Sequence, residues 1–88
     1  MNARLVQDIR GPDVQRGDIE HRALPDGTTA GYAYICPNCG GEDWLNVDDG
    51  TWGWTMTGSI DAPTLRPSIL HRPCGYHAYL TDGAFTPC

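Results

Sequence analysis

Two pairs of closely spaced metal-ligand residues constrain this chain more than any other feature. Cys36 and Cys39 are separated by two residues, and so are Cys74 and His77. Each spacing is typical of a tight turn that points two ligands at one ion. We therefore predict a single zinc ion held by Cys36, Cys39, Cys74 and His77, with Cys88 or His71 as a substitute for His77.

The length of the chain explains why a metal would be needed. Eighty-eight residues make one domain with a small core, and such domains often depend on a metal or on disulfides. The first ten residues lack the apolar run of a secretory signal, so the paired cysteines indicate metal ligands before disulfides. Three thiolates donate so much charge that the zinc would be a poor Lewis acid, which predicts a structural ion.

Glycines and prolines break the sequence into short segments, and no window shows a helical period of apolar residues. This pattern predicts a mainly β fold: a small, zinc-ribbon-like antiparallel sheet. Residues 1–30 are expected to form an extended arm, with a hairpin from Ile19 to Ile35, and residues 31–88 the zinc-stapled domain. Alternation places Tyr32 and Tyr34 on one face of a strand.

Thr51 to Thr57 has the clearest strand pattern. Trp52, Trp54 and Met56 alternate with small or polar residues and would share one face. We interpret them as part of the core. If they were exposed, they would mark a binding surface, to which Arg66 and Arg72 could add contacts.

No catalytic constellation stands out. Ser68 lacks a Gly-x-Ser-x-Gly elbow and is expected to bond a backbone group. Asp48 and Asp49 have the character of solvated turn residues. A zinc-dependent hydrolase, with Asp48, Asp49 or Asp61 as its base, remains an alternative. The net charge of −5 opposes nucleic-acid binding, although a ribbon whose tryptophans stack single-stranded bases is a second alternative.

A longer motif resembles a known family. It combines Trp52-Gly53-Trp54 and Gly58 with Pro63-Thr64-Leu65-x-Pro67-Ser68-Ile69-Leu70 and with Cys74-x-x-His77-x-x-Leu80-x-x-Gly83. This pattern, between Ile35 and Cys88, resembles a family of small phage and prophage proteins, some of which are labelled ammonia monooxygenase. The resemblance implies a zinc-binding β fold of viral origin and no particular activity.

These observations together predict a non-enzymatic, zinc-stabilised protein–protein interaction module of a tailed bacteriophage, such as a virion component. Its partner would be a phage structural protein or a host protein, or a second copy in a homo-oligomer. Nucleic acid and membrane are not expected as partners, and the host cytoplasm or the virion is the expected location. A host-directed inhibitor is a further alternative.

Overall fold

A computed structural model describes all 88 residues, and it contains eight strands and no helix. The strands form two four-stranded sheets, each in the order of the sequence. The first sheet contains β1 (Arg4–Leu5), β2 (Asp18–Ala23), β3 (Thr29–Ile35) and β4 (Glu42–Asn46), and the second contains β5 (Thr55–Gly58), β6 (Pro63–His71), β7 (Tyr76–Thr81) and β8 (Ala84–Pro87). All strand pairs are antiparallel except β1 with β2. The prediction of a mainly β, predominantly antiparallel fold is confirmed.

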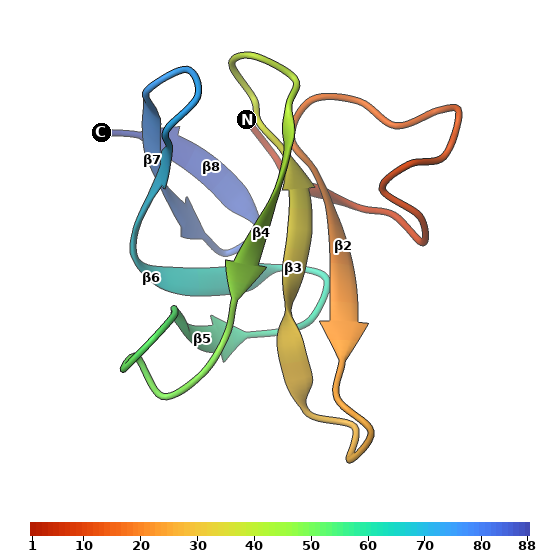
Figure 1. Cartoon of the computed structure of the whole chain (residues 1–88), viewed down its shortest axis with the longest axis vertical. Coiled ribbons are helices and arrows are strands. Elements are labelled where there is room, and N and C mark those ends of the chain that lie inside the picture. Colours follow the sequence, from red (N-terminus) through yellow and green to blue (C-terminus); the bar gives the residue numbers. More distant parts are fainter.

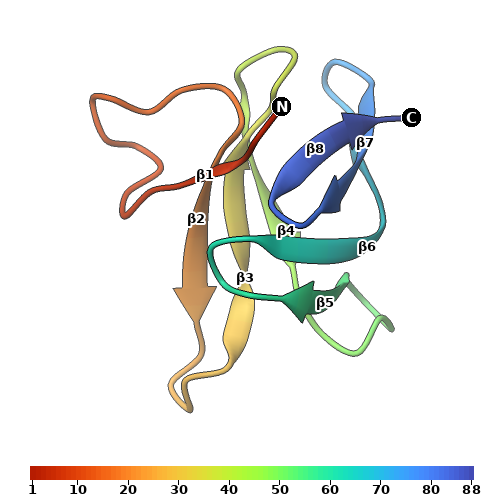
Figure 2. The ribbon, with the colours of Figure 1, turned by 180° about the vertical axis from the view of Figure 1, so that it is seen from behind.

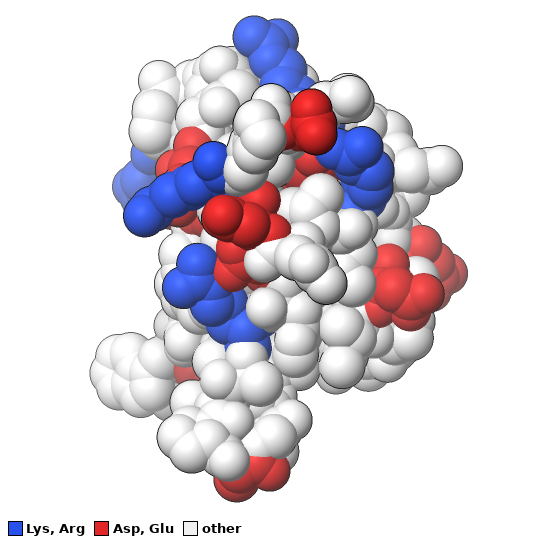
Figure 3. Space-filling view, turned by 90° about the vertical axis from the view of Figure 1, so that its right-hand side faces the viewer, with Lys and Arg blue, Asp and Glu red and all other residues white.

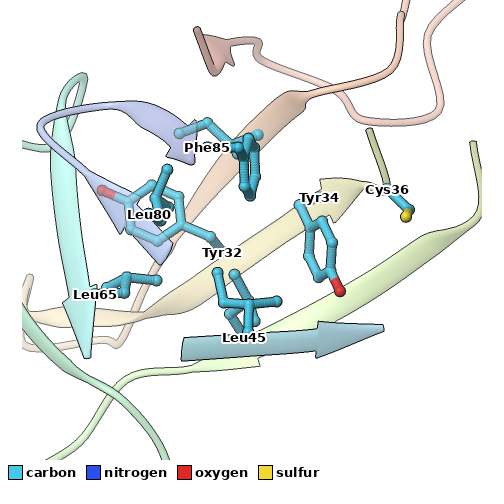
Figure 4. Packing of buried hydrophobic residues seen from close by; sticks show 9 residues of the cluster. Tyr32, Tyr34, Cys36, Leu45, Leu65, Leu80 and Phe85 are labelled. Atoms are coloured by element: carbon cyan, nitrogen blue, oxygen red, sulfur yellow. The ribbon is translucent and has the colours of Figure 1, made fainter. Parts of the chain in front are cut away.

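The core lies between the two sheets, where β6 crosses the face of β3 and β4 (Figures 1 and 2). Tyr32, Tyr34 and Cys36 alternate along one face of β3 and its end, and all three are buried. Figure 4 shows the two tyrosine rings packed among leucines of both sheets and Phe85 of β8. Because aromatic rings bury large apolar areas, this row supplies much of the core and leads directly to the first predicted metal ligand.

Residues 1–30 contribute β1 and β2 to the first sheet, and the predicted hairpin forms between β2 and β3. Met1 and Ala3 also make backbone hydrogen bonds to the start of β8 and to the turn before it, so the beginning of the chain lies against the second sheet (Figure 1). Figure 3 shows arginines and carboxylates side by side on the face that carries β2. Ion pairs within the chain join Arg4 to Asp18, Arg10 to Glu42 and Arg22 to Glu20. The division of the chain at residue 30 stays a prediction.

The expected strand from Thr51 to Thr57 begins later than the alternation indicated. Residues 48–54 form a loop, and β5 starts at Thr55. Trp52 is 89% exposed and Trp54 is partly buried, so the interpretation of Trp52 as a core residue is wrong. Residues 48–54 form a loop in place of a strand because the Asp48 carboxylate accepts three hydrogen bonds from their backbone, as described below. None of the chain forms a helix long and apolar enough to cross a membrane.

Candidate functional site: a metal-ligand cluster beside a serine–histidine pair

Four metal-ligand side chains meet at one end of the core: Cys36, Cys39, His71 and Cys74. Their ligand atoms all lie within 4.8 Å of one another. The Sγ atoms of Cys36 and Cys74 are 3.6 Å apart, and Nδ1 of His71 lies 3.4 Å from the Sγ atoms of Cys39 and Cys74. Ligands at the corners of a tetrahedral zinc site are separated by about 3.5–3.8 Å, given the usual metal–ligand bond lengths. The cluster therefore fits a tetrahedral metal ion.

The backbone around Cys36 and Cys39 has the shape of a metal-binding turn. The amide of Gly40 donates to the Cys36 carbonyl, and Cys36 in turn donates to the carbonyl of Gly41. Gly40 has a φ of 78°, a conformation that glycine adopts without strain. The Gly41 amide also lies 3.4 Å from the Cys39 sulfur, where it stabilises negative charge.

The thiols of the cluster differ in their tendency to ionise. The hydrogen bond with His71 lowers the pKa of Cys74 to about 6. Burial raises the pKa of Cys36. All four cysteines are free of disulfides. A bound cation would offset the cost of holding the buried Cys36 as a thiolate, which is the state that binds metal.

The structure brings together three of the four predicted zinc ligands and places His77 elsewhere. The fourth member of the cluster is His71, which the sequence offered as a substitute. His71 is buried, whereas the His77 side chain is exposed and lies on the outer face of the second sheet. Cys88 is exposed and lies outside the cluster, although its backbone amide donates to the His77 carbonyl.

His77 instead contacts Ser68. Its Nε2 lies 2.7 Å from the Ser68 hydroxyl, and the expectation that Ser68 bonds a backbone group is wrong. Leu70 and His77 are direct cross-strand partners on β6 and β7, which makes Ser68 a diagonal neighbour of His77 on the same face. Ser68 is half-buried and His77 is exposed, so a molecule from solvent can reach the pair.

A bulge in β6 places Ser68 at this position. Leu65 pairs with Leu80 and Ile69 pairs with Ala78, so three residues of β6 stand opposite one residue of β7. The bulge contains Arg66, Pro67 and Ser68, and the Arg66–Pro67 peptide is cis. Bulges commonly redirect a side chain next to an active site. Pairing of β5 with β6 ends at Arg66, so Ser68 lies just past the last pair.

The metal-ligand cluster and the serine–histidine pair share one hairpin. Ser68, His71, Cys74 and His77 follow one another at intervals of three residues along β6, the turn and β7. The amides of Cys74 and Gly75 close the turn by donating to the His71 carbonyl. A metal ion on His71 and Cys74 would therefore clamp the turn that joins Ser68 to His77.

The loop of residues 48–54 lies beside Ser68. The Asp48 carboxylate accepts hydrogen bonds from the backbone amides of Gly50, Trp52 and Gly53. The Trp54 indole N–H donates to the Ser68 carbonyl at 3.3 Å. Asp48 thus organises the loop, and Asp49 likewise accepts from the Thr51 amide.

The two arginines proposed as partner contacts have different roles. The Arg66 guanidinium donates to the Leu65 and Leu80 carbonyls and to the Thr81 hydroxyl, and it lies 4.9 Å from the centre of the Tyr79 ring. It therefore fastens β6 to β7 within the chain. Arg72 is exposed in the turn between these strands.

The fold and the site define a small all-β protein in which a metal-ligand cluster adjoins a solvent-accessible serine–histidine pair. Residues 10–88 match the model of the BubE family, described as the bacterial ubiquitination-like system serine protease. The chain belongs to this family. The match also includes residues 10–34, which the resemblance found in the sequence left out. No curated protein and no solved structure gives a significant match.

This membership corrects the functional prediction. The expected non-enzymatic phage module is wrong, because the family is described as a protease. In the sequence, the absence of a Gly-x-Ser-x-Gly elbow argued against Ser68 as a nucleophile. That elbow is the signature of one fold only, whereas serine–histidine pairs recur on unrelated folds and are identified by geometry.

Proposed function

We propose that the chain is a serine protease in which Ser68 is the nucleophile and His77 the general base. The carrying observation is the 2.7 Å contact between the Ser68 hydroxyl and Nε2 of His77. This distance is within the range that such a pair requires. The description of the BubE family supports the same reaction class.

The pair would act by ordinary acyl transfer. With its ring proton on Nδ1, His77 accepts the hydroxyl proton at Nε2 while Ser68 Oγ attacks the carbonyl carbon of a peptide bond. His77 then donates that proton to the leaving amine, and the acyl group stays on Ser68. A water molecule, deprotonated by His77, releases the acyl group as a carboxylate and restores the hydroxyl. No carboxylate bonds to His77 within the chain.

The metal-ligand cluster would serve a structural role next to this pair. The three thiols and one imidazole suit zinc, and we propose Cys36, Cys39, His71 and Cys74 as its ligands. Zinc bound there would supply a closed, four-coordinate cross-link between the end of β3 and the β6–β7 hairpin. The peptide-cleaving chemistry would belong to Ser68 and His77 on the outer face of that hairpin.

The partner that this function requires is a protein or peptide substrate. By the family's description, we propose a protein of a bacterial ubiquitination-like system as that substrate. Ser68 is half-buried on a strand face, so a flexible or terminal segment of the substrate would reach it more easily than a folded surface.

A fluorophosphonate probe tests the nucleophile directly, because it labels serines that are activated by a neighbouring base. We expect the wild-type chain to gain one label on Ser68 by peptide mass mapping, and Ser68→Ala to gain none. Ser59 is an exposed serine outside the site, and Ser59→Ala should label like the wild type. Absence of label on the folded wild-type chain, or equal labelling of Ser68→Ala, would overturn the assignment.

A further inference from the structure

A shallow groove of about 260 Å³ lies next to Ser68. Its lining consists of the loop residues Gly50, Thr51, Trp52, Gly53 and Trp54, together with Pro67. Pro67 immediately precedes Ser68, and Trp54 is bonded to the Ser68 carbonyl. The groove therefore lies beside the proposed nucleophile, with its Pro67 wall one residue before Ser68 in β6.

The loop that forms the groove is held firmly. Besides the three hydrogen bonds to Asp48, the Trp54 amide donates to the Asn46 carbonyl, and the Trp54 carbonyl accepts from the Asp48 amide. A Cβ atom on Gly53 would stand 2.2 Å from the Asn46 carbonyl oxygen, so only glycine allows this approach. The Trp-Gly-Trp sequence thus lies in a loop of fixed shape that places the Trp54 indole against the Ser68 carbonyl and leaves the Trp52 side chain exposed.

Trp52 has no internal role that explains its position. Its side chain makes no hydrogen bond, and at 89% it is the most exposed large apolar residue of the chain. Exposing an indole from a constrained loop forfeits a substantial burial energy. Such an indole is typical of a binding surface, because a flat, rigid ring contributes contact area at little entropic cost.

We propose that this groove binds an apolar side chain of the substrate next to the cleaved bond, with Trp52 as the residue that selects it. None of the lining residues carries a positive charge, so an acidic side chain would gain no ionic partner there. The volume suits one side chain of an extended peptide and is too small for a folded element. This inference rests on the proposed function, since it takes Ser68 as the nucleophile.

The test compares two tryptophan variants on matched peptides. A parent peptide is first selected with the wild-type chain from a mixed library. Internally quenched versions of it then carry Gly, Leu, Phe or Asp beside the cleaved bond. We expect Leu and Phe to be preferred by the wild type. Trp52→Ala should lose about tenfold in kcat/KM on the Leu and Phe peptides, mainly through KM, and little on the Gly peptide.

Trp44→Ala is the matched control. Trp44 is 40% exposed and lies over Gly31, outside the groove, so its removal should leave the preference unchanged. Fluorophosphonate labelling of Ser68 should be the same in both variants. Equal losses by Trp52→Ala on all four peptides, or no loss on any, would overturn the selection role. Absence of labelling in the wild type would instead reject the proposed nucleophile.

A binding measurement keeps the inference testable without turnover. In Ser68→Ala protein, the indole N–H resonances of Trp52 and Trp44 can be followed by NMR during titration with the Leu and Asp peptides. We expect Trp52 to shift with the Leu peptide and Trp44 to stay in place. A Trp52 resonance that responds to neither peptide, or equally to both, would contradict the proposal.

Discussion

Oδ2 of Asp43 lies 3.6 Å from Nε2 of His71, on the side of the ring opposite the thiols. The distance is longer than a hydrogen bond, but Asp43 is about half exposed and has room to approach. Metal-binding histidines usually donate their second ring proton to such a carboxylate, which fixes the orientation of the ring. Asp43 is therefore in position to orient His71 as a ligand.

We expect Asp43→Ala to weaken zinc binding by about 10–100-fold without preventing folding in excess metal. Competition with a chromophoric chelator measures the affinity. The matched control is Glu42→Ala, because Glu42 is the neighbouring acidic residue and pairs with Arg10 instead. Equal zinc affinities for Asp43→Ala and the wild type would show that Asp43 does not support the site.

The two histidines of the hairpin should respond differently to substitution. His71→Ala removes a ligand atom of the cluster, so we expect loss of bound zinc and a strong loss of stability. His77→Ala removes the partner of Ser68 and should retain one zinc per chain while losing fluorophosphonate labelling. Native mass spectrometry and labelling on the same samples give both readings. Zinc loss in His77→Ala with a folded chain would reverse the assignment of the two histidines.

Removal of the metal should lower the reactivity of Ser68, because the metal ligands and the serine–histidine pair share one hairpin. We expect a chelator to abolish labelling of Ser68, because the turn that joins it to His77 would lose its clamp. Restored labelling after zinc addition, together with recovered tryptophan fluorescence, would show that the loss is reversible. A metal-free chain that stays folded and labels at the wild-type rate would contradict this prediction.

The free energy of unfolding should decrease at acidic pH, because the Glu20 carboxylate becomes protonated. Its carboxylate is buried and accepts from Arg22 and from the Ile9 amide, and these bonds lower its pKa below the usual 4.5. The contribution is therefore present above about pH 4.5 and is lost as the pH falls through the lowered pKa. Glu20→Gln should cost about 1–2 kcal/mol at pH 7 and less near pH 3.

Urea unfolding at the two pH values measures this difference. Glu42→Gln is the control, because its carboxylate lies on the surface in the pair with Arg10 and should contribute little. A Glu20→Gln penalty that is the same at pH 7 and pH 3 would mean that packing, and not charge, accounts for the role of Glu20.

The β fold and the three cysteines of the cluster could be predicted from the sequence, because turn residues and Cys-x-x-Cys spacing act locally. The choice between His71 and His77 could not be made from spacing, since each lies three residues from Cys74. Strand alternation does carry a signal. Ile69 and Ala78 face inward, which puts His71 inside and His77 outside.

Ser68 and the tryptophan loop were harder to predict, for different reasons. The bulge at Arg66–Ser68 changes the register of β6, and no local sequence pattern predicts a bulge of this length. The alternation of Trp52, Trp54 and Met56 resembles a strand, but the hydrogen bonds of Asp48 outweigh it. An aspartate that precedes Gly50 and Gly53 by two and five residues is the signal that favours the loop.

One pair of residues lies between the members of another pair in the hairpin, in the order Ser68, His71, Cys74, His77. The inner two residues belong to the cluster and the outer two to the serine–histidine pair, so all four depend on the same loop length. An insertion or deletion between His71 and Cys74 would change the spacing of both pairs at once. The hairpin turn can therefore accept a different residue more readily than a different length.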